Sequence, residues 1–125
     1  MSADRKKILL VDDSMTIRKL ARAILGADYD FVEAENGADA STVARAERPD
    51  LIVMDLNMPV KDGIEGLADL KSEPDTQGIP VIILTSETEE SKRTRCLALG
   101  CAEFLRKPLD RTQIRGVVTR WLGER

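Results

Sequence analysis

Five short apolar runs, each followed by polar residues, constrain the fold of this chain more than any other feature. The runs occupy residues 7–11, 31–34, 51–54, 80–84 and 102–105. A strand with one face in water alternates apolar and polar residues, whereas a run that is mostly apolar needs cover on both faces. The runs therefore predict a parallel β-sheet with helices packed on both of its faces.

Segments with helical spacing of apolar residues separate these runs. The first has its apolar residues three or four positions apart, at Ile17, Leu20, Ala21, Ile24 and Leu25. Gly26 is placed to end this helix. Further helices are predicted at 38–47, 64–71 and 88–99, and the core spacing of a last helix falls at Ile114, Val117, Val118, Trp121 and Leu122. The helix at 88–99 is unusual because its first eight residues are polar, so that only 96–99 are expected to be buried.

The alternation of five strands with five helices predicts a doubly wound α/β fold, because crossovers between parallel strands are right-handed. No linker or repeat interrupts the pattern, so residues 1–125 are expected to form a single domain.

Composition excludes several classes of function. The net charge of −3 and pI near 5.1 argue against nucleic-acid binding. No apolar run reaches the length of a membrane span, and the N-terminus lacks the apolar core of a signal peptide, so a cytoplasmic location is expected. The absence of histidine excludes an imidazole base or ligand. The two cysteines, Cys96 and Cys101, are expected to be free thiols.

Polar residues that can bind ligands or take part in catalysis follow four of the predicted strands. They are Asp12 and Asp13, Asp55, Thr85, and Lys107. Each alone is weak evidence, because an aspartate after a strand is usually a helix cap or a turn former. In doubly wound sheets, however, ligands bind beyond the carboxyl ends of the strands. The coincidence of all these residues at that rim predicts a functional site.

Three converging carboxylates without histidine or cysteine make an oxygen-donor site for a hard cation. Mg²⁺ fits best, because it takes one or two carboxylates, keeps several waters and commonly bridges to phosphate oxygens. A lysine and a hydroxyl beside such an ion suit phosphoryl chemistry. A carboxylate can then act as the nucleophile and form an acyl phosphate.

The segments VDDSMTIRK, MDLNMPVKDG, ILTS and FLRKP resemble the receiver domain of two-component response regulators, most closely the single-domain chemotaxis (CheY-like) type. The resemblance covers residues 6–122. It implies a flavodoxin-like fold with strand order 2-1-3-4-5 and a histidine kinase as phosphodonor. It also implies a domain that is not an enzyme beyond its own phosphorylation and dephosphorylation.

The resemblance also assigns roles to the residues of the acidic site. Asp55 matches the phosphoryl acceptor, Asp13 the direct magnesium ligand, and Asp12 its neighbour that acts through water. Asn57 would lend its backbone carbonyl to the metal. Lys107 would contact the phosphoryl oxygens and the acceptor carboxylate.

Further positions match the switch of the family. Thr85 would turn its hydroxyl to the phosphoryl group, Ser86 would offer its backbone N–H, and Phe104 occupies the aromatic switch position. Asn57 and Glu87, two residues after the acceptor and after Thr85, are expected to tune the lifetime of the acyl phosphate. Since both are polar, we expect relatively fast self-dephosphorylation.

Two outputs within the family compete, and the resemblance in the DDSMT and NMP segments favours the first, chemotaxis. One is control of a flagellar motor component, bound on the face formed by the helix at 88–99, the strand at 102–105 and the last helix. Basic residues on this side suggest an acidic partner: Lys92, Arg93, Arg95, Arg111 and Arg115. The other is a phosphorelay or phosphate sink. A monomer is expected in either case.

Three other classes are weaker alternatives. An aspartyl phosphatase or phosphotransferase would need a D-x-D motif, where this chain has Asp55-Leu56-Asn57. A dinucleotide-binding domain would need G-x-G-x-x-G after the first strand, and this motif is missing. A receiver cut from a longer transcription factor is disfavoured, because the sequence ends just after the last helix.

Overall fold

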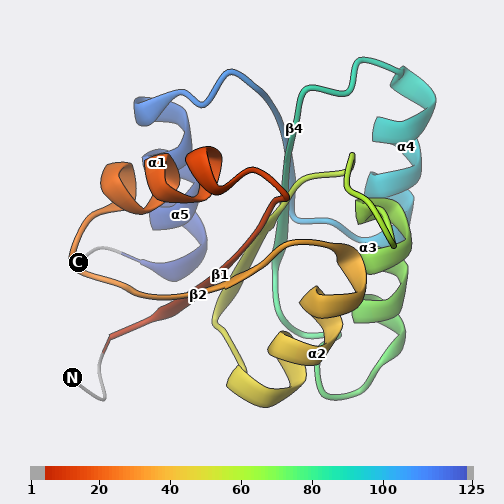
Figure 1. The fold of residues 1–125 in the computed structure, drawn as a ribbon, viewed down its shortest axis with the longest axis horizontal. Helices are drawn as coiled ribbons and strands as arrows, with labels where there is room; N and C mark the ends of the chain where they lie inside the picture. Colours follow the sequence, from red (N-terminus) through yellow and green to blue (C-terminus); the bar gives the residue numbers. More distant parts are fainter. Residues whose placement is uncertain (1–4, 124–125) are drawn as a thin grey trace.

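The fold is described from a computed structural model, which defines residues 5–123 of the chain. Within these residues five strands alternate with five helices (Figure 1). The strands are β1 (Lys7–Val11), β2 (Asp30–Ala34), β3 (Leu51–Met54), β4 (Val81–Thr85) and β5 (Glu103–Arg106). The helices are α1 (Met15–Leu25), α2 (Gly37–Glu47), α3 (Gly63–Ser72), α4 (Glu90–Leu99) and α5 (Arg111–Leu122). None of the helices in this part of the chain combines the length and apolar character that crossing a membrane needs.

All strands are parallel and lie in the order β2-β1-β3-β4-β5, as predicted. Every residue of β3 and β4 is buried, which explains why these segments are apolar except for Thr85 at the end of β4. The register pairs Val11 at the end of β1 with Ala34 on β2 and Met54 on β3. Because these strands end level with one another, the residues that follow them share one edge of the sheet.

Two apolar clusters cover the two faces of the sheet. Helices α1 and α5 pack on one face and α2, α3 and α4 on the other, as Figure 1 shows. Successive residues of β1 point to opposite faces: Ile8 and Leu10 contact the first cluster, and Leu9 and Val11 the second. The sheet therefore has helices on both faces and supports the residues at its edge.

Helix α1 begins at Met15, where the Ser14 hydroxyl accepts a hydrogen bond from the Ile17 N–H at 3.3 Å and caps the helix. Other details differ from the prediction. The prediction that Trp121 lies in the core is wrong. Its side chain is 43 % exposed and donates its indole N–H to Glu103 at 3.0 Å.

The predicted buried stretch 96–99 of α4 is also wrong in part. Only Cys96 is buried, whereas Leu97 is 44 % exposed. Both cysteines are free, as expected.

Candidate functional site

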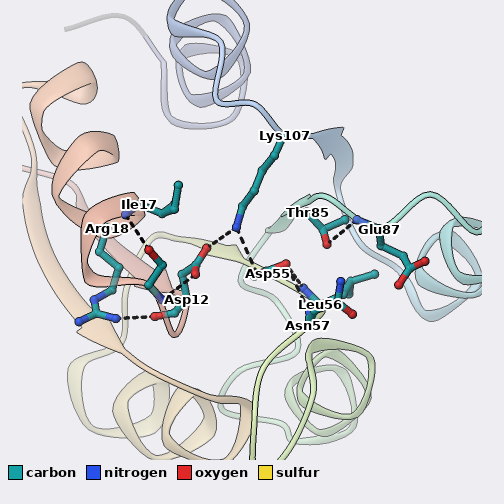
Figure 2. A network of polar contacts seen from close by, with 10 residues as sticks. Asp12, Ile17, Arg18, Asp55, Leu56, Asn57, Thr85, Glu87 and Lys107 are labelled. Atoms are coloured by element: carbon teal, nitrogen blue, oxygen red, sulfur yellow. Dashed lines mark hydrogen bonds and ion pairs between the residues drawn. The ribbon is translucent and has the colours of Figure 1, made fainter.

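The polar residues predicted to share one rim of the sheet lie together there. Asp12 follows β1, Asp55 follows β3, Thr85 ends β4 and Lys107 follows β5 (Figure 2). Backbone hydrogen bonds extend the sheet past its strand ends: the N–H of Asp55 donates to the carbonyl of Val11 at 3.0 Å, and that of Lys107 to the carbonyl of Thr85 at 2.8 Å. These bonds attach the site residues to the sheet itself.

Asp12, Asp13 and Asp55 form a cluster in which one carboxylate oxygen from each residue lies within 4.8 Å of the others. Asp12 and Asp55 are each 5 % exposed, whereas Asp13 faces solvent. Carboxylate oxygens at this spacing suit a hard divalent cation that retains several waters. The predicted three-carboxylate metal site is therefore confirmed in its geometry.

The Lys107 ammonium brings positive charge to the two buried carboxylates. It donates to Asp12 at 2.9 Å and to Asp55 at 3.2 Å. Burial alone would lower the pKa of Lys107, but the carboxylates of Asp12 and Asp55 outweigh it and raise that pKa. Burial raises the pKa of Asp12, and hydrogen bonds from Lys107 and the Ser14 N–H offset only part of that rise. Lys107 is thus a firmly protonated cation inside an acidic site.

The carboxylate of Asp55 is held from two sides. One oxygen accepts hydrogen bonds from the backbone N–H groups of Leu56 at 2.7 Å and Asn57 at 3.3 Å, and the other faces Lys107. Helix α3 begins directly behind it: a Cβ on Gly63 would lie 2.1 Å from the backbone oxygen of Asp55. Only glycine permits this close approach, so Gly63 helps to fix the acceptor.

Arg18 is a residue of this region that sequence reasoning missed. Its guanidinium is buried and donates to the backbone carbonyl of Asp12 (Figure 2). It also donates a hydrogen bond to Glu33 on β2 at 2.6 Å. A charged residue in an amphipathic helix is usually taken to face water. The signal that could have found it is spacing, since Arg18 lies three and seven positions before the buried Ala21 and Leu25.

The loop after β4 is organised around Glu87. The hydroxyl of buried Thr85 accepts a hydrogen bond from the Glu87 N–H at 3.1 Å. The Glu87 carboxylate accepts from the N–H groups of Thr88 and Glu89 and from the Lys92 ammonium, each at 3.1 Å. The Glu89 N–H and the Lys92 ammonium lower the pKa of Glu87. These bonds explain why α4 starts at Glu90 rather than at the predicted residue 88.

The remaining predicted residues lie around this centre. Phe104 is half-buried on β5, packs against the cluster on the α2–α4 face and has the Arg106 guanidinium 5.7 Å from its ring centre. Arg106 in turn pairs with Glu90 of α4 at 3.8 Å. Ser86 and Asn57 are exposed at the rim.

Residues 8–119 match the family model of the response regulator receiver domain. The chain belongs to this receiver family. It is 36 % identical over 115 residues to the chemotaxis protein CheY of Halobacterium salinarum, which covers 91 % of this chain and 94 % of that protein. It is also 36 % identical over 105 residues to the protein PilH of Pseudomonas aeruginosa, which covers 83 % and 87 % of the two chains.

Solved receiver structures share the same fold. The receiver domain of a sensor histidine kinase from Pseudomonas aeruginosa, with a magnesium ion coordinated in its active site cleft, matches with a TM-score of 0.84 and 29 % identity, over 96 % of this chain and 99 % of that one. The chemotaxis response regulator CheY4 of Vibrio cholerae matches with a TM-score of 0.84 and 31 % identity, over 93 % and 98 %. As a receiver, this chain is a signalling domain rather than a classical enzyme, and membership of this family implies a histidine kinase as partner.

Proposed function

We propose that this receiver accepts a phosphoryl group on the carboxylate of Asp55, with Mg²⁺ bound at Asp12, Asp13 and Asp55. The observation that carries the proposal is the Lys107 ammonium, which bridges Asp55 and Asp12 at 3.2 and 2.9 Å inside the acidic cluster. A bound Mg²⁺ would supply positive charge to the phosphoryl oxygens in addition to that of Lys107. The magnesium ion in the related receiver from Pseudomonas aeruginosa supports this choice of metal.

In the proposed reaction an oxygen of Asp55 forms a bond to the phosphorus of a phosphohistidine, and the P–N bond of the donor breaks. The imidazole leaves with the bonding electron pair and takes up a proton from solvent. Lys107 stabilises the charge on the phosphoryl oxygens, which is the main source of catalysis in phosphoryl transfer. Asp13 would hold the metal directly, Asp12 would act through water, and the backbone carbonyl of Asn57 would be a further protein ligand.

The proposed switch starts at Thr85. Its hydroxyl now accepts a hydrogen bond from the Glu87 N–H. Phosphorylation adds oxygens that draw the hydroxyl of Thr85 and the N–H of Ser86 towards Asp55, and Phe104 fills the space that Thr85 leaves. This is a population shift between two packings, driven by the tighter contacts of the phosphorylated state.

Replacement of Asp55 by asparagine tests the acceptor, because an amide cannot form the acyl phosphate. We expect Asp55→Asn to take up no label from radioactive acetyl phosphate with Mg²⁺. The exposed Asp28, in the loop before β2 at the other end of the sheet, offers a matched control, and Asp28→Asn should be labelled normally. Normal labelling of Asp55→Asn would refute the assignment.

Mg²⁺ should also stabilise the fold, because it binds the folded cluster and relieves repulsion among the three acids. We expect the melting temperature to rise with Mg²⁺ concentration and to fall back when a chelator is added. An unchanged melting temperature at Mg²⁺ concentrations that saturate phosphorylation would contradict the proposed metal site.

We further propose that the phosphorylated form controls motility through the face of α4, β5 and α5. The two chemotaxis regulators among its relatives support this output, and the face carries exposed Leu97 and Trp121 beside basic residues. Binding of a flagellar motor switch component should therefore be tighter after phosphorylation. No binding, together with rapid transfer to a histidine-containing phosphotransfer domain, would instead support a phosphorelay or phosphate sink.

We propose that Asn57 and Glu87 set the lifetime of the acyl phosphate, because neither provides an apolar lid against water. Exposed Asn57 flanks Asp55, and the Glu87 carboxylate is held by Lys92 beside Thr85. Replacing both with bulky residues, in the double variant Asn57→Met and Glu87→Tyr, should slow the decay of the acyl phosphate. An unchanged rate of acyl-phosphate decay in the double variant would contradict this role of Asn57 and Glu87.

A further inference from the structure

Arg18 is a buried cation beside the acidic cluster that the proposed reaction does not use. Its side chain lines a small cavity beneath the rim together with Asp12 and Asp55. The residue is only 7 % exposed. Burial of a guanidinium is costly unless hydrogen bonds and an opposite charge compensate for it. The partners of Arg18 therefore determine where it lies.

Those partners connect three elements of the fold. Arg18, on α1, donates from one nitrogen to the backbone carbonyl of Asp12 and from Nε to Glu33 of β2 at 2.6 Å. The other oxygen of Glu33 accepts from Arg22 at 2.6 Å. Burial acts to raise the pKa of Glu33, but the guanidinium groups of Arg18 and Arg22 outweigh it and lower that pKa. Glu33 thus remains charged and anchors Arg18 against the end of β1.

Asp13 depends on this anchor because its own side chain is unsupported. Among residues 5–123, no side chain or N–H group donates to the Asp13 carboxylate. Its position is therefore set by the backbone that carries it. The N–H of Asp12 is held by Ala34 at 3.1 Å and its carboxylate by the Ser14 N–H at 2.9 Å. The carbonyl of the Asp12–Asp13 peptide is held by Arg18.

We propose that Arg18 is a positioning residue for the divalent cation: it locks the Asp12–Asp13 peptide and thereby places the Asp13 carboxylate within the cluster. Rotation of that peptide would break the bond to Arg18 and leave a buried guanidinium without its carbonyl partner. The inference rests on the proposed function, in which Asp13 is a direct ligand. Arg18 acts through the backbone and touches neither the metal nor the phosphoryl group.

Two matched variants test this role. Arg18→Met removes the bond to the Asp12 carbonyl and keeps most of the side-chain volume. Arg22→Met removes the other guanidinium from the same Glu33 carboxylate without any contact to Asp12. In calorimetric titration with Mg²⁺, we expect Arg18→Met to raise the dissociation constant about tenfold, because loss of a residue that supports a metal ligand commonly lowers metal affinity by this much. We expect Arg22→Met to bind Mg²⁺ as the unaltered protein does.

Phosphorylation by acetyl phosphate provides a second measurement. Arg18→Met should need more Mg²⁺ for half-maximal rate but reach the normal rate at saturation, since Asp55 and Lys107 are untouched. Arg18→Lys should restore part of the Mg²⁺ affinity, because an ammonium can also donate to the carbonyl. It also serves as the test if Arg18→Met does not fold. Equal loss of affinity in the Arg18 and Arg22 variants would overturn the proposal.

A readout without metal separates this inference from the proposed function. In metal-free protein, NMR relaxation of the Asp13 amide should show new motion in Arg18→Met and none in Arg22→Met. An Asp13 amide as rigid in Arg18→Met as in the unaltered protein would overturn the role of Arg18, whatever the metal does. Absence of Mg²⁺ binding by the unaltered protein, with the Asp13 amide released as expected, would instead refute the proposed metal site.

Discussion

Helices α1 and α4 both begin at the functional rim of the sheet, yet they are stabilised very differently. Helix α1 buries Arg18, Ala21, Ile24 and Leu25, and the Ser14 side chain caps its N-terminus. Helix α4 buries Cys96 alone, and its N-cap residue makes no side-chain hydrogen bond to the helix. Most helical stability in proteins comes from burial of an apolar face, so α4 should be much the weaker of the two.

From this contrast we expect a rigid half and a mobile half of the site. The α1 half holds Asp12 and Asp13, whose positions must not change if a metal is to bind tightly. The α4 half follows Thr85, and Glu90 forms two exposed ion pairs there, one within α4 to Arg93 at 3.0 Å and one to Arg106 of β5 at 3.8 Å. Exposed pairs contribute little stability, so phosphorylation can displace this half at small cost.

The largest difference should appear when apolar side chains are truncated. Ile24 of α1 is 6 % exposed, so Ile24→Ala should lower the free energy of unfolding by about 3 kcal/mol. Leu97 of α4 is exposed, so Leu97→Ala should cost about 0.5 kcal/mol. Urea unfolding of both variants measures the difference. Equal losses would mean that α4 packs as firmly as α1 and would remove the basis for a mobile half.

A smaller effect should follow from removing the N-terminal cap of α1 and adding one to α4. Ser14→Ala removes the cap of α1 and should cost about 1 kcal/mol. Glu89→Ser gives α4 the side-chain cap that it lacks and should stabilise that helix by about 0.5 kcal/mol. Native-state hydrogen exchange shows which helix responds. If Glu89→Ser left the exchange of α4 amides unchanged, the missing cap would not be the reason for the weakness of α4.

The sequence alone predicted what depends on local pattern. The fold class and the meeting of Asp12, Asp13 and Asp55 followed from apolar runs and from the residues at their ends, whereas the strand order came from the resemblance to receiver domains. The start of α4 could not be predicted, because it depends on a Glu87 carboxylate that takes two backbone N–H groups ahead of the helix. Helical spacing says nothing about such a bond.

Two side chains show where the periodicity itself misleads. Trp121 lies at core spacing on α5 but reaches outward to Glu103 on the edge strand β5, since its indole N–H needs a partner. Arg18 is charged but buried, because its partners come from the end of β1 and from β2. Both outcomes depend on tertiary contacts that no single helix or strand encodes.

The smallest expected effect is a difference in acid sensitivity between the two halves. Glu33, bonded to Arg18, and Glu87, bonded to Lys92, both have a lowered pKa in the folded state. When the pKa of a carboxyl is lower in the folded state than in the unfolded chain, the unfolded chain binds the proton more tightly, and protonation favours unfolding. Its contribution is therefore complete above the ordinary glutamate value of about 4.3 and is lost as the pH falls below it.

Glu33→Gln and Glu87→Gln should thus be less stable than the unaltered protein at pH 7, with the deficit shrinking as the pH falls below the ordinary glutamate value and the native carboxyls become protonated too. Two guanidinium groups hold Glu33 at 2.6 Å, whereas one ammonium holds Glu87 at 3.1 Å, so the deficit should be larger for Glu33→Gln. Melting temperatures measured from pH 3 to 7 give both profiles. A larger pH-dependent deficit for Glu87→Gln would place the stronger electrostatic anchor on the α4 half and reverse the assignment of rigid and mobile halves.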